Sequence, residues 1–382
     1  MDATYTILQH YWWLVISLLA AALVFLLFVQ GGQSLLYTIG RTPLQRDLIV
    51  NSLGRKWELT FTTLVTFGGA FFASFPLFYS TSFSGAFYLW NAILLVFVIQ
   101  AVAYQFRRKP DNFLGDKTYE WFLVINGVAG TFLLGVAVGT LFTGADFTVD
   151  RSNIASSGNR IISQWGNRWH GLEALSDYRN MALGIAVLFL SRILALQYFI
   201  NDIDEPQIKA SSSKRIGCAA VPFLAGFLTF FISLMLSRGL SVNPVTEEIY
   251  PQDYKYLLGA LRMPYVSVPM LLGIVSVLYG IYLGWRKGSR KAIWWSGAGT
   301  VATMLGLMLL AGWNDTCYYP SLSDMQSSLN IYNSSSSLFT LTVMSVVSLI
   351  VPAVIWYISL AWKSIGGTPI GESEIKDGEH TY

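Results

Sequence analysis

The sequence has few residues of the kinds that bind metals or cofactors. It contains only three histidines, His10, His170 and His380, and two cysteines, Cys218 and Cys317. No two long apolar segments carry histidines that could face each other, so two imidazoles of this chain are not expected to hold a haem. The cysteines are far apart in sequence and in expected depth, which argues against a disulfide or a cysteine metal site.

Charged residues and nucleotide-binding motifs are also scarce. Only 12% of the residues are charged and the net charge is +3, whereas soluble domains contain about 25% charged residues. Such a small, scattered charge does not fit nucleic-acid binding, and no nucleic-acid partner is expected. There is no phosphate-binding loop and no dinucleotide fingerprint, because the glycine-rich pieces lie inside apolar stretches. These absences exclude the common nucleotide-dependent enzymes.

Long apolar segments are what the sequence has instead. Hydrophobic residues make up 53% of the chain, with 13 tryptophans, and the mean hydropathy is +0.49. A bilayer-spanning helix needs about 20 apolar residues, and nine such helices are predicted, at 10–30, 57–79, 86–106, 119–142, 180–201, 216–237, 265–285, 292–313 and 338–362. The predicted fold class is an all-α polytopic membrane protein, with residues 1–382 as a single integral membrane domain and 363–382 as a cytoplasmic tail. The first segment lacks a basic start and a cleavage pattern, so it is expected to be a retained span.

Basic residues predict the orientation in the membrane. An odd number of spans places the termini on opposite sides, and 17 of the 25 Lys and Arg residues fall on one side. They are Arg41, Arg46, Arg55, Lys56, Arg107, Arg108, Lys109, Lys117, Lys209, Lys214, Arg215, Arg286, Lys287, Arg290, Lys291, Lys363 and Lys376. The positive-inside rule therefore places the N-terminus outside and the C-terminus in the cytoplasm.

One carboxylate stands at the start of the second expected span, in the run Arg55-Lys56-Trp57-Glu58. Ionisable groups at a membrane boundary are costly to desolvate, so Glu58 is a candidate for proton or ion movement. Alternatively, Glu58 faces lipid headgroups, pairs with Arg55 or Lys56, and favours the positive end of the helix dipole. The residue itself does not separate these two interpretations.

Other polar residues lie inside the expected spans. Gln30 and Gln33 share one face at the end of the first span, and Gln100 and Gln105 lie in the third. Amides can join helices by hydrogen bonds or line a wet path, but they cannot carry a proton by changing charge. Arg192 lies halfway along the fifth span and needs a carboxylate, a carbonyl or a lipid or quinone headgroup, either as a structural clamp or in a redox or proton role.

Small residues recur at four-residue spacing in two spans. The fourth expected span contains Gly127, Thr131, Gly135 and Gly139, and a shorter pattern of Gly69 and Ala73 lies in the second. Ridges of small side chains let membrane helices approach closely. Both patterns therefore predict helix packing.

Short motifs along the whole chain resemble subunit II of the cytochrome bd-type quinol oxidases. The motifs are Tyr11-Trp12-Trp13, Ile39-Gly40-Arg41, Asn51-Ser52, Trp57-Glu58, Gly68-Gly69-Ala70, Phe75-Pro76, Phe83-Ser84-Gly85, Gly135-Val136-Ala137-Val138-Gly139, and Asn333 followed by Ser336, Ser337, Leu338, Thr340, Leu341 and Met344. Each motif is short, but their order and spacing are specific.

The resemblance implies a fold, a partner and a division of labour. It implies two four-helix bundles plus a ninth peripheral helix, paired with a similar subunit I. Subunit I would carry haems b and d and oxidise quinol, while this chain would stabilise it. Such a subunit can also line a proton or oxygen route, hold a structural quinone, and contact lipids and small single-helix accessory subunits. The implied location is the bacterial cytoplasmic membrane.

The sequence departs from the family pattern at several positions. Where family members carry an Asp-Gly-x-Asp pattern, this chain has Gln30-Gly31-Gly32-Gln33. An acidic position of the family matches Gln105, and an arginine position matches Gln100. Glu58 is then the only matched acidic member of the implied proton path. A long aromatic residue associated with an oxygen route corresponds to Thr63, close to Trp57, so a gating role for these two residues rests on the resemblance alone.

Two alternatives remain open from the residues. Nine spans, inward-facing amides and a lone intramembrane arginine would also suit a transporter or channel subunit. No clear inverted repeat and no midplane cluster of ionisable groups supports that class, however. A purely structural membrane anchor is the third interpretation.

Overall fold

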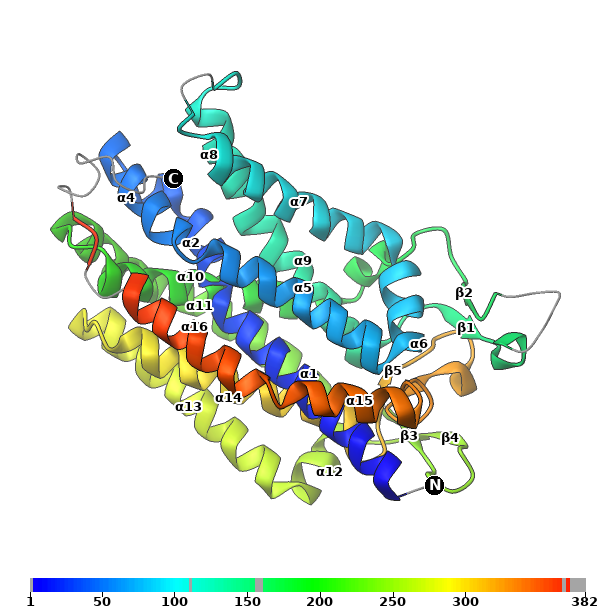
Figure 1. The fold of residues 1–382 in the computed structure, drawn as a ribbon. Helices are drawn as coiled ribbons and strands as arrows, with labels where there is room; N and C mark the ends of the chain where they lie inside the picture. Colours follow the sequence, from blue (N-terminus) through cyan, green and yellow to red (C-terminus); the bar gives the residue numbers. More distant parts are fainter. Residues whose placement is uncertain (1–2, 110–111, 155–160, 366–368, 372–382) are drawn as a thin grey trace.

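The computed structural model describes residues 3–109, 112–154, 161–365 and 369–371. Figure 1 shows long helices running side by side, with α4 and α8 at one end of the molecule and short β-hairpins at the other. The expected all-α membrane fold is confirmed. Most of the predicted tail lies outside the described residues, and so do Lys376 and His380.

The helices account for most of the described chain. The α-helices are α1 (Ala3–Leu26), α2 (Phe28–Gln33), α3 (Leu36–Ile39), α4 (Pro43–Gly54), α5 (Trp57–Ser74), α6 (Pro76–Phe78), α7 (Phe87–Phe106), α8 (Asp116–Ile125), α9 (Thr131–Thr143), α10 (Tyr178–Asp202), α11 (Pro206–Leu236), α12 (Lys255–Arg262), α13 (Pro264–Lys287), α14 (Ala292–Gly312), α15 (Leu338–Ser348) and α16 (Val351–Ile365). Two π-helices, η1 (Tyr79–Ser84) and η2 (Asn126–Gly130), and three 3-10 helices, η3 (Arg151–Ile154), η4 (Leu172–Ser176) and η5 (Met325–Ser327), complete the helical part.

Eight helical segments of the described chain are long and apolar enough to cross a membrane, and a bent ninth segment qualifies when its two parts are counted together. The bend separates Pro43–Ser74 from Pro76–Ser84 by 115°. Pro76 has no N–H to donate and restricts the backbone of Phe75, so a straight helix cannot pass this point. The second span, expected to run through to residue 79, therefore turns sharply at Phe75.

Close helix contacts follow one of the two small-residue patterns. A Cβ atom on Gly135 would lie 2.7 Å from the Gly184 Cα on α10, and one on Gly127 would lie 2.4 Å from the Gln30 carbonyl oxygen on α2. The ridge thus packs against α2 and α10, as expected. Gly69 is different, because a Cβ there would meet nothing within 4 Å. The prediction of a close helix contact at Gly69 and Ala73 is therefore wrong for Gly69, which faces open space within this chain.

The loops opposite α4 form three antiparallel hairpins that the helical pattern did not predict. Their strands are β1 (Phe147–Val149) with β2 (Ser163–Trp165), β3 (Gly239–Val242) with β4 (Ile249–Gln252), and β5 (Cys317–Tyr319) with β6 (Leu329–Asn330). Lys255, at the start of α12, is buried beneath them with 2% of its surface exposed. Its ammonium donates to Ser241 Oγ at 2.5 Å and to the Asn314 carbonyl oxygen at 2.7 Å.

Candidate functional site

Buried side-chain amides meet between α2, α7 and η2. Gln100 Oε1 accepts from Gln30 Nε2 at 2.8 Å, from Gln33 Nε2 at 2.9 Å, and from Asn126 Nδ2. Asn126 Nδ2 also donates to Gln33 Oε1 at 2.9 Å, and Gln33 Nε2 donates to the Tyr104 hydroxyl at 3.0 Å. These five residues, called the amide cluster below, are all buried. Of the predicted path residues, Gln30, Gln33 and Gln100 are therefore brought together.

The amide cluster leaves several polar atoms without partners. Among the described residues, Gln30 Oε1, Gln100 Nε2 and Asn126 Oδ1 are buried and have no hydrogen-bond partner. A buried amide atom without a partner costs about 1–3 kcal/mol. Buried water molecules commonly satisfy such atoms by bridging two to four polar groups. The cluster therefore has the chemistry of a hydrated site.

Local helix irregularities place the amides. The first span is interrupted at Leu27, and α2 then carries Gln30 and Gln33 toward α7. In the fourth span, the π-helix η2 begins at Asn126. A π-helical turn inserts one extra residue per turn and often occurs at functional sites. Gly127 then allows η2 to approach the α2 backbone.

Asn126 and Tyr104 were not predicted as members of the site. Asn126 is the only asparagine between residues 119 and 142, inside an otherwise apolar expected span. A polar side chain in such a place is itself an indication of a helix contact or a wet path. The phenol of Tyr104 gave no comparable indication, because tyrosine is common near membrane boundaries.

The other predicted path residues do not join the amide cluster. Glu58 is exposed on α5 and has no hydrogen-bond or ion-pair partner within the described ranges, and Gln105 is exposed on α7. Trp57 stacks on the Tyr104 ring at 5.4 Å between centroids, so it covers the cluster. Thr63 donates to the Leu59 carbonyl oxygen of its own helix at 2.7 Å.

Arg192 joins two helices. Its Nε donates to Ser34 Oγ at 2.9 Å, and its guanidinium lies 5.1 Å from the centre of the Phe189 ring. The backbone of α10 is in close contact here, since a Cβ on Gly31 would lie 2.1 Å from the Ser191 carbonyl oxygen. Arg192 thus contacts a hydroxyl and a ring, and within the described residues it forms no ion pair with a carboxylate. This geometry is that of a clamp between α2 and α10.

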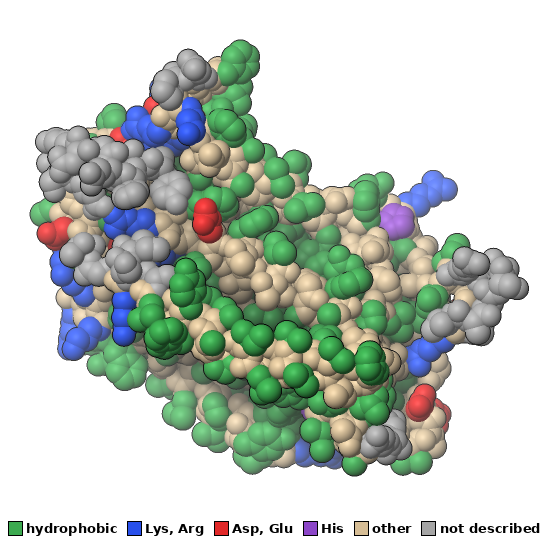
Figure 2. Space-filling model, in the orientation of Figure 1, with side chains coloured by type: hydrophobic (Ala, Val, Ile, Leu, Met, Phe, Trp, Pro, Cys, Tyr) green, Lys and Arg blue, Asp and Glu red, His purple; other side chains and the backbone are tan. Residues whose placement is uncertain are grey.

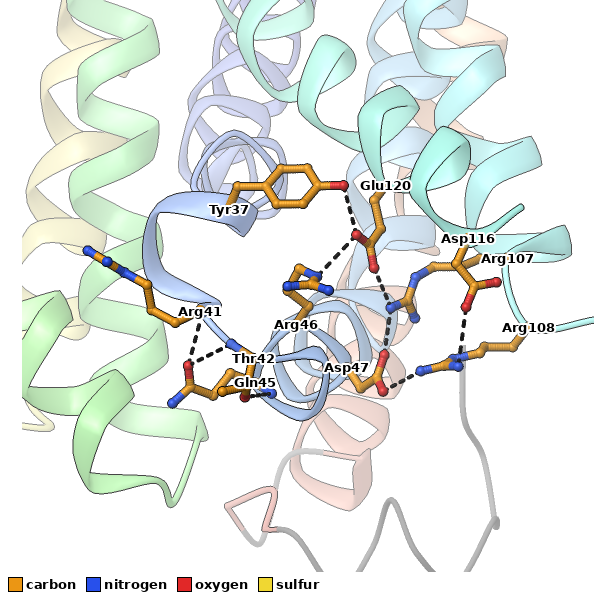
Figure 3. A network of polar contacts seen from close by, with 10 residues as sticks. All are labelled: Tyr37, Arg41, Thr42, Gln45, Arg46, Asp47, Arg107, Arg108, Asp116 and Glu120. Atoms are coloured by element: carbon orange, nitrogen blue, oxygen red, sulfur yellow. Dashed lines mark hydrogen bonds and ion pairs between the residues drawn. The ribbon is translucent and has the colours of Figure 1, made fainter. Parts of the chain in front are cut away.

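A cluster of ion pairs joins α4 to the end of α7 and to α8 (Figure 3). Arg107 Nη2 donates to Glu120 Oε1 at 2.8 Å and to Asp47 Oδ1 at 2.5 Å. Arg46 Nε lies 3.1 Å from Glu120 Oε2, to which the Tyr37 hydroxyl donates at 2.8 Å. Arg107 is 2% exposed and Glu120 is 3% exposed. Arg108 pairs with Asp47 and lies 3.5 Å from Asp116, and these seven residues are called the ionic cluster below.

The start of α4 fixes two members of the ionic cluster. Thr42 caps the helix by accepting from the Gln45 N–H at 3.2 Å, while Gln45 Oε1 accepts from the Thr42 N–H, and Pro43 occupies the first helical position. This reciprocal cap and the proline favour a helix beginning here. Arg46 and Asp47 follow within its first turns and are aimed at α7 and α8 (Figure 3).

Two members of the ionic cluster that lie outside the membrane spans, Tyr37 and Arg107, have shifted pKa values. Burial, together with the hydrogen bond to the Glu120 carboxylate, raises the pKa of Tyr37 to about 12. Burial acts to lower the pKa of Arg107, but its hydrogen bonds to Glu120 and Asp47 outweigh burial and raise that pKa. Both groups therefore remain protonated donors at neutral pH.

The amide and ionic clusters lie on the same helices. Tyr104 and Arg107 are three positions apart on and just after α7, and Glu120 and Asn126 are six positions apart across α8 and η2. At 1.5 Å of rise per residue, these separations correspond to about 5–9 Å along the helix axes. Buried polar groups therefore extend from the end with α4 into the apolar part of the protein.

The surface has the distribution of a membrane protein. Figure 2 shows Lys and Arg side chains gathered at the end that carries α4, called the basic end below, and hydrophobic side chains across the middle. In the part of the chain that the structure describes, no three His, Cys, Asp or Glu side chains are grouped to hold a metal ion. His10 Nδ1 lies 2.9 Å from the Thr6 carbonyl oxygen and His170 Nδ1 lies 3.1 Å from that of Gly85. Both contacts are to backbone carbonyl oxygens on separate segments of the chain.

Comparisons with known proteins give one consistent family. Residues 8–365 match the family model described as cytochrome bd terminal oxidase subunit II. The chain is 23% identical to cytochrome bd-I ubiquinol oxidase subunit 2 of Escherichia coli, with 99% of each chain covered. It is 25% identical to cytochrome bd ubiquinol oxidase subunit 2 of Bacillus subtilis, with 90% of each covered.

A solved structure shares the fold. The bd oxidase from Geobacillus thermodenitrificans contains a chain that matches 93% of this protein and is itself covered to 98%, with a TM-score of 0.60 and 13% identity. The comparisons give no support to the transporter or channel alternative. Since the family model spans nearly all of the sequence, the chain belongs to the family of cytochrome bd terminal oxidase subunit II and is a membrane subunit of a quinol:oxygen oxidoreductase.

Proposed function

We propose that this chain is the haem-free subunit that stabilises subunit I and provides a hydrated proton path beside it. Haems b and d would be held by subunit I, where quinol oxidation and oxygen reduction take place. The scarcity of histidine supports this division, since no two of the expected spans carry histidines that could face each other across a haem. The residues of this chain would act on protons and on the stability of the complex.

The observation that carries the proton path is the run of buried polar groups from the ionic cluster to the amide cluster. Water molecules held by Gln30 Oε1, Gln100 Nε2 and Asn126 Oδ1 would connect the two. The amides order water, and a carboxylate supplies the group that can gain and lose a proton. Glu120 is the buried carboxylate of this run, with Tyr37 donating to it.

Glu120 also has a purely structural interpretation. Its carboxylate contacts Arg46 and Arg107, so it ties α4 and α7 to α8. A buried carboxylate held by two guanidinium groups is costly to leave unpaired. The proton path therefore needs a test at a residue that carries no charge.

Gln100 is that residue, because its oxygen accepts from three amides. Gln100→Met keeps the side-chain length and removes every polar atom, so the hydrogen-bonded centre of the amide cluster is lost. We expect lower quinol-driven oxygen consumption and lower proton uptake per haem in membrane vesicles. The matched control is Gln105→Met, on the same helix but exposed, which should leave both rates unchanged. Normal proton uptake by a fully assembled Gln100→Met complex would contradict the path.

The complex is expected in the bacterial cytoplasmic membrane, with the N-terminus outside and the basic end on the cytoplasmic side. The distribution of Lys and Arg supports this orientation. The helices α15 and α16 leave most of their apolar side chains exposed, and the window Leu338–Leu360 is only 6% buried. This face can be covered by lipid, by subunit I or by a small single-helix accessory subunit. A structural quinone on this chain is a further expectation from the family resemblance.

A further inference from the structure

A cavity of about 550 Å³ opens at the basic end between the first span, α10, α14 and α16. Its apolar wall includes Phe25, Phe28 and Ile293, and Trp294 and Ile358 reach the surface at its mouth. The volume lies within the roughly 300–1,000 Å³ that small-molecule sites occupy. Apolar walls and a tryptophan at the rim are typical of a site at the level of lipid headgroups.

The ammonium of Lys56 lines this cavity, together with the polar side chains of Tyr198, Asn201, Asp202 and Ser359. Lys56 is 1% exposed, and its Nζ lies 4.3 Å from the centre of the Trp362 ring. Among the described residues, Nζ has no hydrogen-bond partner, although an ammonium has three donors. A ring face attracts a cation but accepts no full set of hydrogen bonds. The site therefore needs an acceptor that the described residues do not supply.

Asp202 lowers the cost of burying Lys56 without filling that need. Its carboxylate lines the same cavity and attracts the ammonium, but it accepts a hydrogen bond from Ser52 Oγ, and no ion pair joins it to Lys56. Lys363 stands exposed at the mouth and adds a second ammonium. Two ammonium groups face one carboxylate, so the cavity favours an anion over a neutral headgroup.

We propose that this cavity binds one anionic phospholipid. Its phosphate would accept hydrogen bonds from Lys56 Nζ and pair with Lys363, and an acyl chain would lie along Phe25 and Phe28. The basic end is expected on the cytoplasmic side, where membrane leaflets are rich in anionic lipids. The lipid would join α16 to the ends of α5 and α10. This site is separate from the amide cluster and does not depend on the proton path.

Native mass spectrometry of the purified oxidase tests the proposal. After detergent delipidation, the complex is mixed with vesicles of phosphatidylglycerol or of phosphatidylcholine, and bound lipid is counted. We expect one phosphatidylglycerol that resists delipidation, and about tenfold weaker retention of it in Lys56→Met, which corresponds to about 1.4 kcal/mol. Lys287→Met is the matched control, because Lys287 is exposed beside the Tyr282 ring and should retain the lipid.

Several results would overturn the proposal. Equal retention of phosphatidylglycerol by Lys56→Met and the unchanged protein would show that Lys56 does not bind the phosphate. Equal retention of phosphatidylcholine would remove the charge argument. Displacement of the lipid by millimolar inorganic phosphate would assign the site to a free anion, and a co-purifying quinone lost in Lys56→Met would assign it to a neutral headgroup. If Lys56→Met does not assemble with haem, lipid retention is measured in Lys56→Arg, which keeps the charge and should retain the lipid.

Discussion

The two ends of the molecule each bury a cation, and they do so in different ways. At the basic end, Arg107 donates to the carboxylates of Glu120 and Asp47. Beneath the hairpins at the opposite end, the partners of Lys255 among the described residues are neutral oxygens, those of Ser241 and Asn314. Burial outweighs the attraction of Asp315 and lowers the pKa of Lys255 to about 8.

The difference shows how the partner decides what a buried cation can do. Arg107 keeps its charge at every physiological pH, because two carboxylates favour the charged form. Lys255 can lose its proton near pH 8 at little cost, because a neutral amine still donates to the same oxygens. The first arrangement fixes the joint between α4, α7 and α8, and the second makes the hairpin end sensitive to pH.

The largest effect should come from Arg107→Met. Removing one member of a buried ion pair leaves the others uncompensated, at a cost of about 3–5 kcal/mol. We expect little assembled complex, measured as haem per subunit II in membranes. Arg108→Met is the control, because Arg108 is 41% exposed and such pairs contribute about 0–1 kcal/mol. Equal losses in the two variants would mean that burial of Arg107 is not what matters.

The pH dependence of stability should distinguish the Lys255 end. The native pKa of about 8 lies below the usual 10.5, so between these values the unfolded chain binds more protons. Stability therefore rises with pH across that window, by up to about 3 kcal/mol, and is independent of Lys255 below pH 8. Thermal denaturation of the complex at pH 7.5 and 9.5 measures this rise. The rise in stability due to Lys255 should be absent in Lys255→Met and present in Lys287→Met. Identical pH profiles for the unchanged protein and both variants would contradict the role of Lys255.

A smaller effect is expected from Tyr37→Phe. The substitution removes the hydroxyl that donates to Glu120 but leaves Arg46 and Arg107 in place. A hydrogen bond to a charged acceptor contributes about 1.5–3 kcal/mol, and we expect the lower limit because the two arginines remain. Chemical denaturation of the purified complex measures the loss. Tyr178→Phe, which removes an exposed hydroxyl 3.4 Å from Ser233 Oγ, should have no measurable effect, and a similar loss there would contradict the special position of Tyr37.

The smallest effect on stability is expected from Glu58→Gln. An exposed carboxylate without an internal partner changes stability by about 0.5 kcal/mol or less. If Glu58 takes part in proton uptake, as the family resemblance implies, uptake per haem should fall while haem content stays normal. Unchanged uptake would make Glu58 a group that faces lipid headgroups. Comparison with Glu120→Gln then shows whether buried and exposed carboxylates of the basic end serve different purposes.

The fold class could be predicted from the sequence better than the site. Apolar length predicted a helical membrane protein, and the three-residue spacing of Gln30 and Gln33 placed both on one face of the helix. The five positions between Gln100 and Gln105 correspond to about 140° around a helix, so both could not enter one cluster, and Gln105 is exposed. The spacing alone therefore excludes Gln105 from a cluster that contains Gln100. Pro76 likewise predicts the bend at Phe75.

The ionic cluster could not be predicted from the residues. Asp47, Arg107 and Glu120 stand near span ends, where charged side chains usually face water or headgroups. Only the folding of α4 against α7 and α8 buries them. The hairpins at the opposite end were missed because strands of two to four residues carry no readable alternation. Long-range pairing decides the ionic cluster, whereas the hairpins pair strands that are close in the sequence, such as β3 with β4.

The ionic cluster also has a consequence for the order of events during synthesis. Asp47 and Arg107 are 60 positions apart in the chain. At about 5–20 residues per second, Arg107 leaves the ribosome about 3–12 s after Asp47, and Glu120 follows shortly afterwards. Until then, the carboxylate on α4 has neither of its arginine partners from the α7 end. The cluster therefore closes only after the third span and the start of the fourth have been synthesised.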